Sequence, residues 1–123
     1  MIVGNNEMTK LIALLITVSL LAGCRVVTRK HEVADVTKAE VIVLTKKPGQ
    51  GPVHSLSVVG HGKIDGNAEI SLMLHGGQYK TEKMSGRVDF RWGGDWYSDQ
   101  AEIRYNPGVV TGGSLGLKCK FNN

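Results

Sequence analysis

Ser114 is the residue whose surroundings most resemble a catalytic motif. It lies at the centre of "GGSLG", residues 112–116, which matches the G-x-S-x-G pattern of the nucleophile elbow in serine hydrolases. That elbow joins a strand to a helix, and the acid and histidine of the triad follow the serine in the chain. Only seven residues follow Gly116, and none of them is His, Asp or Glu. We therefore predict that these glycines serve a turn and a strand edge, not catalysis.

Carboxylates at short spacing are the next candidates for chemistry. Asp65, Asn67 and Glu69 alternate as in part of a calcium loop, but the further ligands and the distal glutamate of such a loop are missing. An Asp-Gly turn between strands is the preferred interpretation. Asp95 and Asp99 bracket "WYS", and an extended chain at about 3.3 Å per residue separates them too far to share a proton. We predict that both are solubilising turn residues.

A metal site is the third possibility. His54, His61 and His75, with Met73 and Met84, are residue types that bind copper or zinc. His75 and Met73 share a strand face, but no two histidines have ligand spacing. Scattered surface histidines are the simpler interpretation. The sequence thus predicts no catalytic residue, no metal ligand and no cofactor.

The two cysteines differ sharply in their surroundings. Lys10 precedes an apolar segment, Leu11 to Leu21, of about 11 residues, which is too short to cross a bilayer and has the layout of an export signal. It ends on "LAGC", where Gly23 precedes Cys24. Cys119 lies near the far end of the chain, in an apolar alternating segment, and we predict that it is a buried free thiol.

The residues "LAGC" and the segment before them resemble the lipobox of bacterial lipoproteins, over Met8 to Arg25 only. The resemblance implies cleavage between Gly23 and Cys24, with a diacylglycerol on the Cys24 thiol and, usually, a further acyl chain on its new amino group. Arg25 is not the aspartate that favours retention in the inner membrane. The resemblance therefore implies a lipid anchor in the outer membrane, facing the periplasm. A start at Met8 instead of Met1 would give a more typical signal.

Beyond the anchor, the chain divides into a tether and one domain. Residues 24–38 are charged and lack a sustained apolar period, which predicts a lipid anchor followed by a flexible tether. Arg25, Arg29 and Lys30 could lie on anionic headgroups or in a solvated linker, and both interpretations stay open. The formal net charge of +4 does not indicate nucleic acid, because no segment interleaves basic and aromatic residues.

Residues 39–123 contain short alternating segments separated by glycine, and none has a helical period. About seven such segments predict an all-β fold, a small antiparallel β-sandwich or barrel. We expect the segment of residues 53–64 to be interrupted at Gly60 and Gly62, as at a bulge or bend, a hairpin at Gly76-Gly77, and the end of a second hairpin at "NPG", residues 106–108. The predicted core contains Val, Ile and Leu side chains with Phe90, Trp92 and Cys119.

The segment "RVDFRWGGDWYSDQAEIRYNPG", residues 87–108, predicts a hairpin with a two-residue turn at Gly93-Gly94 or Gly94-Asp95. Directly opposed residues share a face, so an even-length turn would bury Trp92 and expose Trp96. An exposed tryptophan beside arginines has the composition of a binding hot spot. The predicted contact residues are Trp96, Arg91, Tyr97 and Arg104.

These observations favour a non-catalytic binding or interaction module on the bacterial envelope, with an envelope or foreign protein as its partner. An inhibitor of a foreign lysozyme, or an exclusion lipoprotein of a phage or plasmid, would have this size and architecture. Two other classes stay open: a structural or assembly accessory of an envelope complex and, with less support, a periplasmic metal-handling protein.

Overall fold

The protein folds as an all-β domain. The computed structural model describes residues 28–123, so the predicted export signal, Gly23, Cys24 and Arg25 lie outside the described residues. All strand pairs are antiparallel, which confirms the predicted fold class. No helix long and apolar enough to cross a bilayer occurs among residues 28–123. The strands are β1 (Thr28–Glu32), β2 (Glu40–Thr45), β3 (Ser55–Leu74), β4 (Gly77–Asp95) and β5 (Gln100–Asn122).

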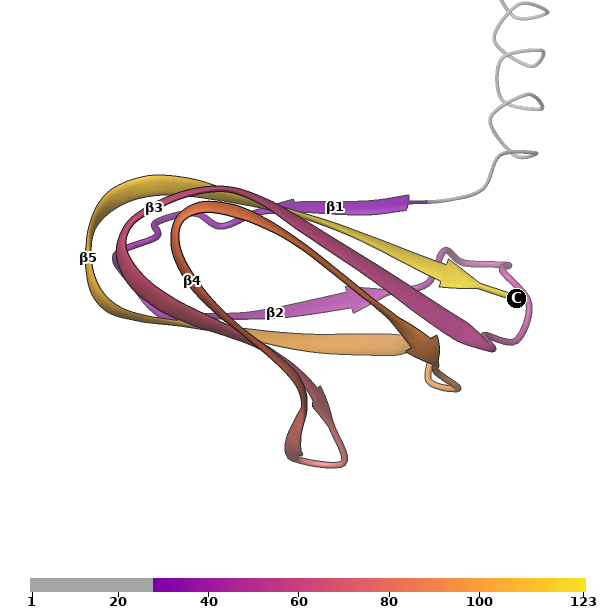
Figure 1. Cartoon of the computed structure of the whole chain (residues 1–123). Coiled ribbons are helices and arrows are strands. Elements are labelled where there is room, and N and C mark those ends of the chain that lie inside the picture. Colours follow the sequence, from indigo (N-terminus) through magenta and orange to yellow (C-terminus); the bar gives the residue numbers. More distant parts are fainter. Residues whose placement is uncertain (1–27) are drawn as a thin grey trace, which may run out of the picture.

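One sheet folds over on itself to make two layers, because its three longest strands are bent (Figure 1). The strand order is β1-β5-β3-β4, and β2 also pairs with β5. β1 pairs with residues 116–120 of β5, whereas β2 pairs with residues 100–105. The first layer therefore contains β1 and the C-terminal part of β5, and the second contains β2 and its N-terminal part. The same bend divides β3 and β4 between the layers.

The expected number of strands was wrong because several predicted breaks lie inside continuous strands. β3 runs without interruption through Gly60 and Gly62, and β5 runs through residues 106–108. Register shifts of β3 against both neighbours fall instead around Asp65 and Gly66, which form a bulge within β3 and not a turn between strands; a further shift against β4 lies between Leu72 and Met73. Gly66 has a φ of 135°, and a Cβ there would lie 1.8 Å from the carbonyl oxygen of Val109. Glycine thus permits β3 and β5 to approach each other closely at the bend.

The hairpin between β3 and β4 is confirmed, with its turn one residue earlier than expected. Leu74 pairs with Gly77, so the turn consists of His75 and Gly76. Both have positive φ, 52° and 79°, as a type I′ turn requires. The tip of this hairpin projects beyond the two layers (Figure 1).

The core lies between the layers and follows the predicted alternation. Leu115, Leu117, Cys119 and Phe121 of β5 point inward, and their fractional exposure does not exceed 2%. Phe90 and Trp92 pack with ring centroids 4.8 Å apart. Cys119 is buried and free, as predicted, and burial raises the pKa of its thiol to about 12. The remaining inward residues of the three long strands are Leu56, Val58, Ile64, Ala68, Ile70, Leu72, Met84, Val88, Ala101, Ile103 and Tyr105.

The predicted tether is wrong from Thr28 onward. β1 pairs with β5, and Val33 and Val36 in the following segment are buried. The Tyr105 hydroxyl donates a hydrogen bond to the carbonyl oxygen of Val36 at 2.6 Å, and burial, with a smaller effect of the Asp35 carboxylate, raises the pKa of this hydroxyl. β1 lacks apolar alternation because it is a charged edge strand, and charged residues are common on sheet edges.

Candidate functional site

β4 and β5 do not form the predicted hairpin. β4 pairs with β3 alone, and β5 lies on the other side of β3. The segment between Asp95 and Gln100 therefore carries the chain from the first layer to the second at one end of the sandwich (Figure 1). Because the two strands are not neighbours, turn parity does not determine which face Trp96 occupies.

Trp96 is buried, with 4% of its surface exposed, which overturns the prediction that it is a surface residue. Its indole Nε1 donates a hydrogen bond to the carbonyl oxygen of Gln100 at 3.0 Å, and its backbone N–H donates to the carbonyl oxygen of His54 at 3.0 Å. The Tyr79 ring lies 6.3 Å away, centroid to centroid. Trp96 therefore closes the end of the sandwich, where the chain passes between the layers.

The other predicted contact residues do not form one surface. Tyr97 is 74% exposed and packs edge to face on His54 at 6.3 Å. Arg91 projects from the first layer, whereas Arg104 lies on the outer face of the second layer and pairs with Glu102 at 2.9 Å. Only Arg104 and the edge of Trp96 line a common groove, of about 360 Å³.

The candidate catalytic and metal-binding residues are dispersed. Within residues 28–123, no three His, Cys, Asp or Glu side chains lie close enough together to hold a metal ion. Ser114 is exposed within β5, where no helix follows it. Asp99 forms a salt bridge with Lys46 at 3.1 Å, and Asp95 pairs in register with Ser55 on the neighbouring strand.

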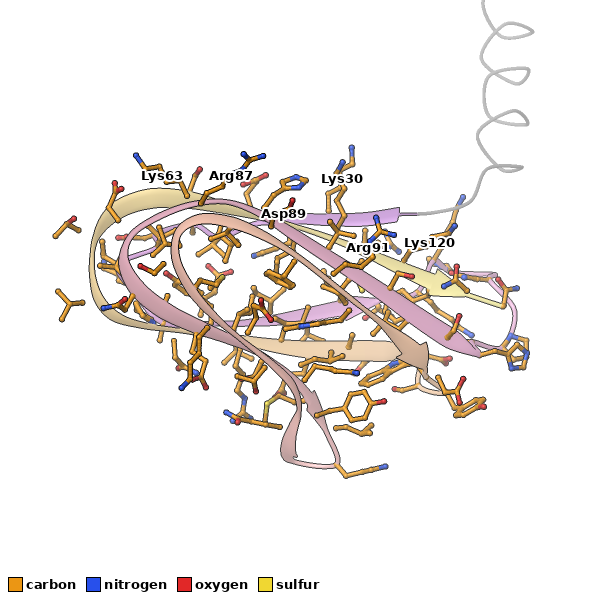
Figure 2. The ribbon with its side chains drawn as sticks, viewed as in Figure 1. Lys30, Lys63, Arg87, Asp89, Arg91 and Lys120 are labelled. Atoms are coloured by element: carbon orange, nitrogen blue, oxygen red, sulfur yellow. The ribbon has the colours of Figure 1, made fainter. Side chains whose placement is uncertain are left out.

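The largest concentration of charge lies on the outer face of the first layer, which we call the basic face. Six exposed cations project from four adjacent strands, and two carboxylates, Glu32 and Asp89, lie among them. Asp65 and Asp95 border the face at its two ends. Figure 2 shows five of the cations, with Asp89 between them, on one side of this layer. The six are Lys30, Lys63, Arg87, Arg91, Lys118 and Lys120.

Strand register places these cations in rows across the sheet. Lys30 is directly opposite Lys118, and Lys63 is directly opposite Arg87. Six residues along a strand and three spacings between strands give a patch of about 20 by 14 Å. Like charges directly opposite each other destabilise a sheet. Two such pairs on one face are therefore not explained by stability alone.

Most of these cations have no acidic partner in the described part of the chain. Lys63 is the exception, because its Nζ lies 3.6 Å from Oδ1 of Asp65. No salt bridge within residues 28–123 involves Lys30, Arg87, Arg91, Lys118 or Lys120.

The opposite face of the sandwich has balanced charge. There Lys83 is directly opposite Glu69, and Arg104 pairs with Glu102. A surface groove of about 550 Å³ near the bend has Ala68 and Met84 in its apolar lining and the Lys83 and Glu69 pair beside them. The contrast between the two faces makes the basic face the candidate binding surface.

Sequence reasoning missed this face because it depends on strand order. Alternation correctly placed Lys118 and Lys120 outward, but only the structure shows that β5 lies between β1 and β3. Arg29, which was grouped with Lys30, instead donates to the carbonyl oxygen of Thr45 at 2.9 Å. The sequence signal that could have indicated this face was the recurrence of basic residues at outward positions of several strand segments.

Comparison with known proteins supports the fold and leaves the function open. No protein-family model matches the chain, and no curated protein matches it. Among solved structures, the mitogen derived from Yersinia pseudotuberculosis (YPM) is similar with a TM-score of 0.51 and 13% identity, over 80% of this chain and 87% of that one. PliG of Aeromonas hydrophila, a periplasmic inhibitor of g-type lysozyme, gives a TM-score of 0.44 and 15% identity over 82% and 90%. A CBM36 carbohydrate-binding module solved with calcium and xylotriose gives 0.38 and 14% over 80% and 90%. At these identities, the likeness to the mitogen shows a shared fold alone.

Proposed function

We propose that the protein is an exported, lipid-anchored and non-catalytic binding module that binds a polyanionic partner through its basic face. The observation that carries this proposal is the placement of Lys30 opposite Lys118 and of Lys63 opposite Arg87. Each such pair costs the sheet up to about 1 kcal/mol. An anion that lies across the rows removes this repulsion and gains charge-assisted hydrogen bonds, which are among the strongest in proteins.

The side chains suit a flat anionic surface more than a small ligand. All six cations are exposed, and they project from one face of the sheet. Arg87 and Arg91 can each donate two parallel hydrogen bonds to a phosphate, sulfate or carboxylate, whereas the lysines act as point charges. An inhibitor or an exclusion factor that used this face would need an acidic surface on the protein that it contacts.

A soluble polyanion tests the role of the face. Acylated full-length protein in non-ionic detergent should be retained on a heparin column, and Arg91→Gln/Lys120→Gln should elute at clearly lower salt. Loss of two charge-assisted contacts should weaken binding at least about tenfold. The matched control is Arg104→Gln/Lys83→Gln, which removes the same charge from the opposite face. Equal elution shifts for the two variants would overturn the proposal.

The anchor needs a separate test, because Cys24 lies outside the described residues. We propose that its acyl chains hold the protein at the outer membrane, facing the periplasm, since two or more chains anchor a protein stably. Labelled palmitate should enter the wild type and not Cys24→Ser. Equal labelling of both would contradict an anchor at Cys24, and Cys119→Ser, which keeps Cys24, is the control.

A further inference from the structure

The short stretch of sequence between Cys24 and β1 bears on which anion the basic face binds. We infer that the basic face lies flat on anionic phospholipid headgroups of the membrane that holds the acylated Cys24. The inference rests on the proposed anion binding by this face and on acylation of Cys24. The polyanionic partner of the basic face is then the phospholipid headgroup layer.

The first step is the length of chain between the anchor and the face. Thr28, where β1 begins, is the fourth residue after Cys24. Four extended residues reach at most about 14 Å. Acyl chains on Cys24 would therefore hold β1 within that distance of the headgroups. The 14-residue tether expected from the sequence would have left the domain free to stand away from the membrane.

The second step is which face of the domain is next to that anchor. Lys120 pairs with Thr28 at the anchored end of β1, and Lys118 pairs with Lys30 two residues later. Three cations thus lie at the point where the chain comes from the membrane. Arg91 continues the row of Lys118 across β3, because both oppose Val59. The cations nearest the anchor and those farther across the sheet belong to one face.

The third step is the combination of the lipid anchor at Cys24 with the electrostatic attraction of the basic face. A basic cluster beside a lipid anchor is attracted to anionic headgroups, by about fivefold in affinity for each cation near the surface. Two engaged cations would favour the docked orientation about 25-fold. Docking by this face would leave the opposite face, with Arg104 and the exposed Val41 and Val43, directed away from the membrane.

Cysteine accessibility in vesicles tests the orientation. His61→Cys places a thiol in the middle of the basic face, and Thr81→Cys places one on the opposite face; both positions are exposed. Cys119 is buried, so it contributes little labelling. The full-length acylated variants are reconstituted into phosphatidylcholine vesicles with or without phosphatidylglycerol. The rate of reaction with a membrane-impermeant maleimide is then measured for each variant.

Phosphatidylglycerol should slow labelling of His61→Cys at least tenfold and leave Thr81→Cys unchanged. High salt should abolish the difference, since the Debye length falls to about 3 Å at 1 M. Adding Arg91→Gln/Lys120→Gln should also restore labelling of His61→Cys, whereas Arg104→Gln/Lys83→Gln should not. Ser57→Cys, on the same face, gives a second position if His61→Cys folds poorly.

Two results would overturn the inference in distinguishable ways. His61→Cys could react equally fast in both kinds of vesicle while retention of the protein on heparin still depends on Arg91 and Lys120. The proposed anion binding would then stand, but the partner would be an acidic protein and not the membrane. If heparin binding also fails to depend on Arg91 and Lys120, both the proposed function and the inference fall.

Discussion

Replacing Trp96 with alanine should destabilise the domain severely, although Trp96 lies in a connection between strands. Its side chain is 4% exposed, and its indole Nε1 donates to the Gln100 carbonyl oxygen at 3.0 Å. Truncation of a buried tryptophan typically costs about 3 to 5 kcal/mol. At about 4 to 8 °C per kcal/mol for a domain of this size, the melting temperature should fall by about 12 °C or more.

Matched variants separate burial from the hydrogen bond. Trp96→Phe keeps a ring but loses the N–H donor, and should cost about 1 to 2 kcal/mol. Tyr97→Ala, at the next position, removes an aromatic side chain that is 74% exposed, and should change stability by no more than about 0.5 kcal/mol. Urea unfolding measures the change in the free energy of unfolding for Trp96→Ala, Trp96→Phe and Tyr97→Ala, provided that the dependence of that free energy on urea concentration is the same as in the wild type.

Fluorescence gives an independent check, because the chain has two tryptophans. Trp92→Phe leaves Trp96 as the only tryptophan, and with excitation selective for tryptophan its emission should be blue-shifted and poorly quenched by acrylamide. A red-shifted, readily quenched spectrum in the folded Trp92→Phe protein, or a loss below about 1 kcal/mol for Trp96→Ala, would refute the burial of Trp96.

Three further predictions concern the buried thiol, the bend and the ion pair between β1 and β2. Cys119 should react with thiol reagents only after denaturation, and fast labelling of the native protein would contradict its burial. Because burial raises the pKa of Cys119 to about 12, the free energy of unfolding should fall as pH rises from about 9 towards 12, and it should fall less in Cys119→Ala. Gly66→Ala should lower the free energy of unfolding by more than about 3 kcal/mol or prevent folding, since the added Cβ would lie 1.8 Å from the Val109 carbonyl oxygen. A near-neutral effect of this substitution in urea unfolding would contradict the bulge at Gly66. Burial is the largest effect on Glu40 and disfavours its ionisation, but the 2.5 Å hydrogen bond with His31, the hydrogen bond from the Ala34 backbone N–H and the charge of His31 together outweigh burial and lower the pKa of Glu40. The contribution of Glu40 to stability should therefore be full near neutral pH and be lost as pH falls below about 4, so the stability difference between the wild type and Glu40→Gln should shrink on acidification and not grow.

Local alternation predicted the inward faces well. Phe90, Trp92, Ile103 and Cys119 are all buried as expected, because a half-buried strand repeats every two residues whatever its neighbours are. The turn at Gly76 was also predictable, since few residues tolerate positive φ. These features depend on a few consecutive residues, so they can be read from the chain itself.

Long-range pairing was not predictable in the same way. The assignment of Trp96 failed because it assumed that β4 and β5 are neighbours, whereas both pair with β3. Likewise, Lys30 and Lys118 are separated by most of the chain and meet only because β1 pairs with β5. The glycines that seemed to break strands instead let long strands bend, as at Gly66. Alternation contains no information on which strands are adjacent.

The basic face is tested most directly by mapping where a polyanion binds. Isotope-labelled full-length protein in non-ionic detergent is titrated with a heparin oligosaccharide, and the amide resonances of residues 28–123 are followed by NMR. The largest shifts should occur in the outward rows of the first layer, around Lys30, Arg87, Arg91 and Lys118, with little change near Arg104 on the opposite face. Shifts centred on Arg104, or no saturable shifts at all, would contradict binding by the basic face.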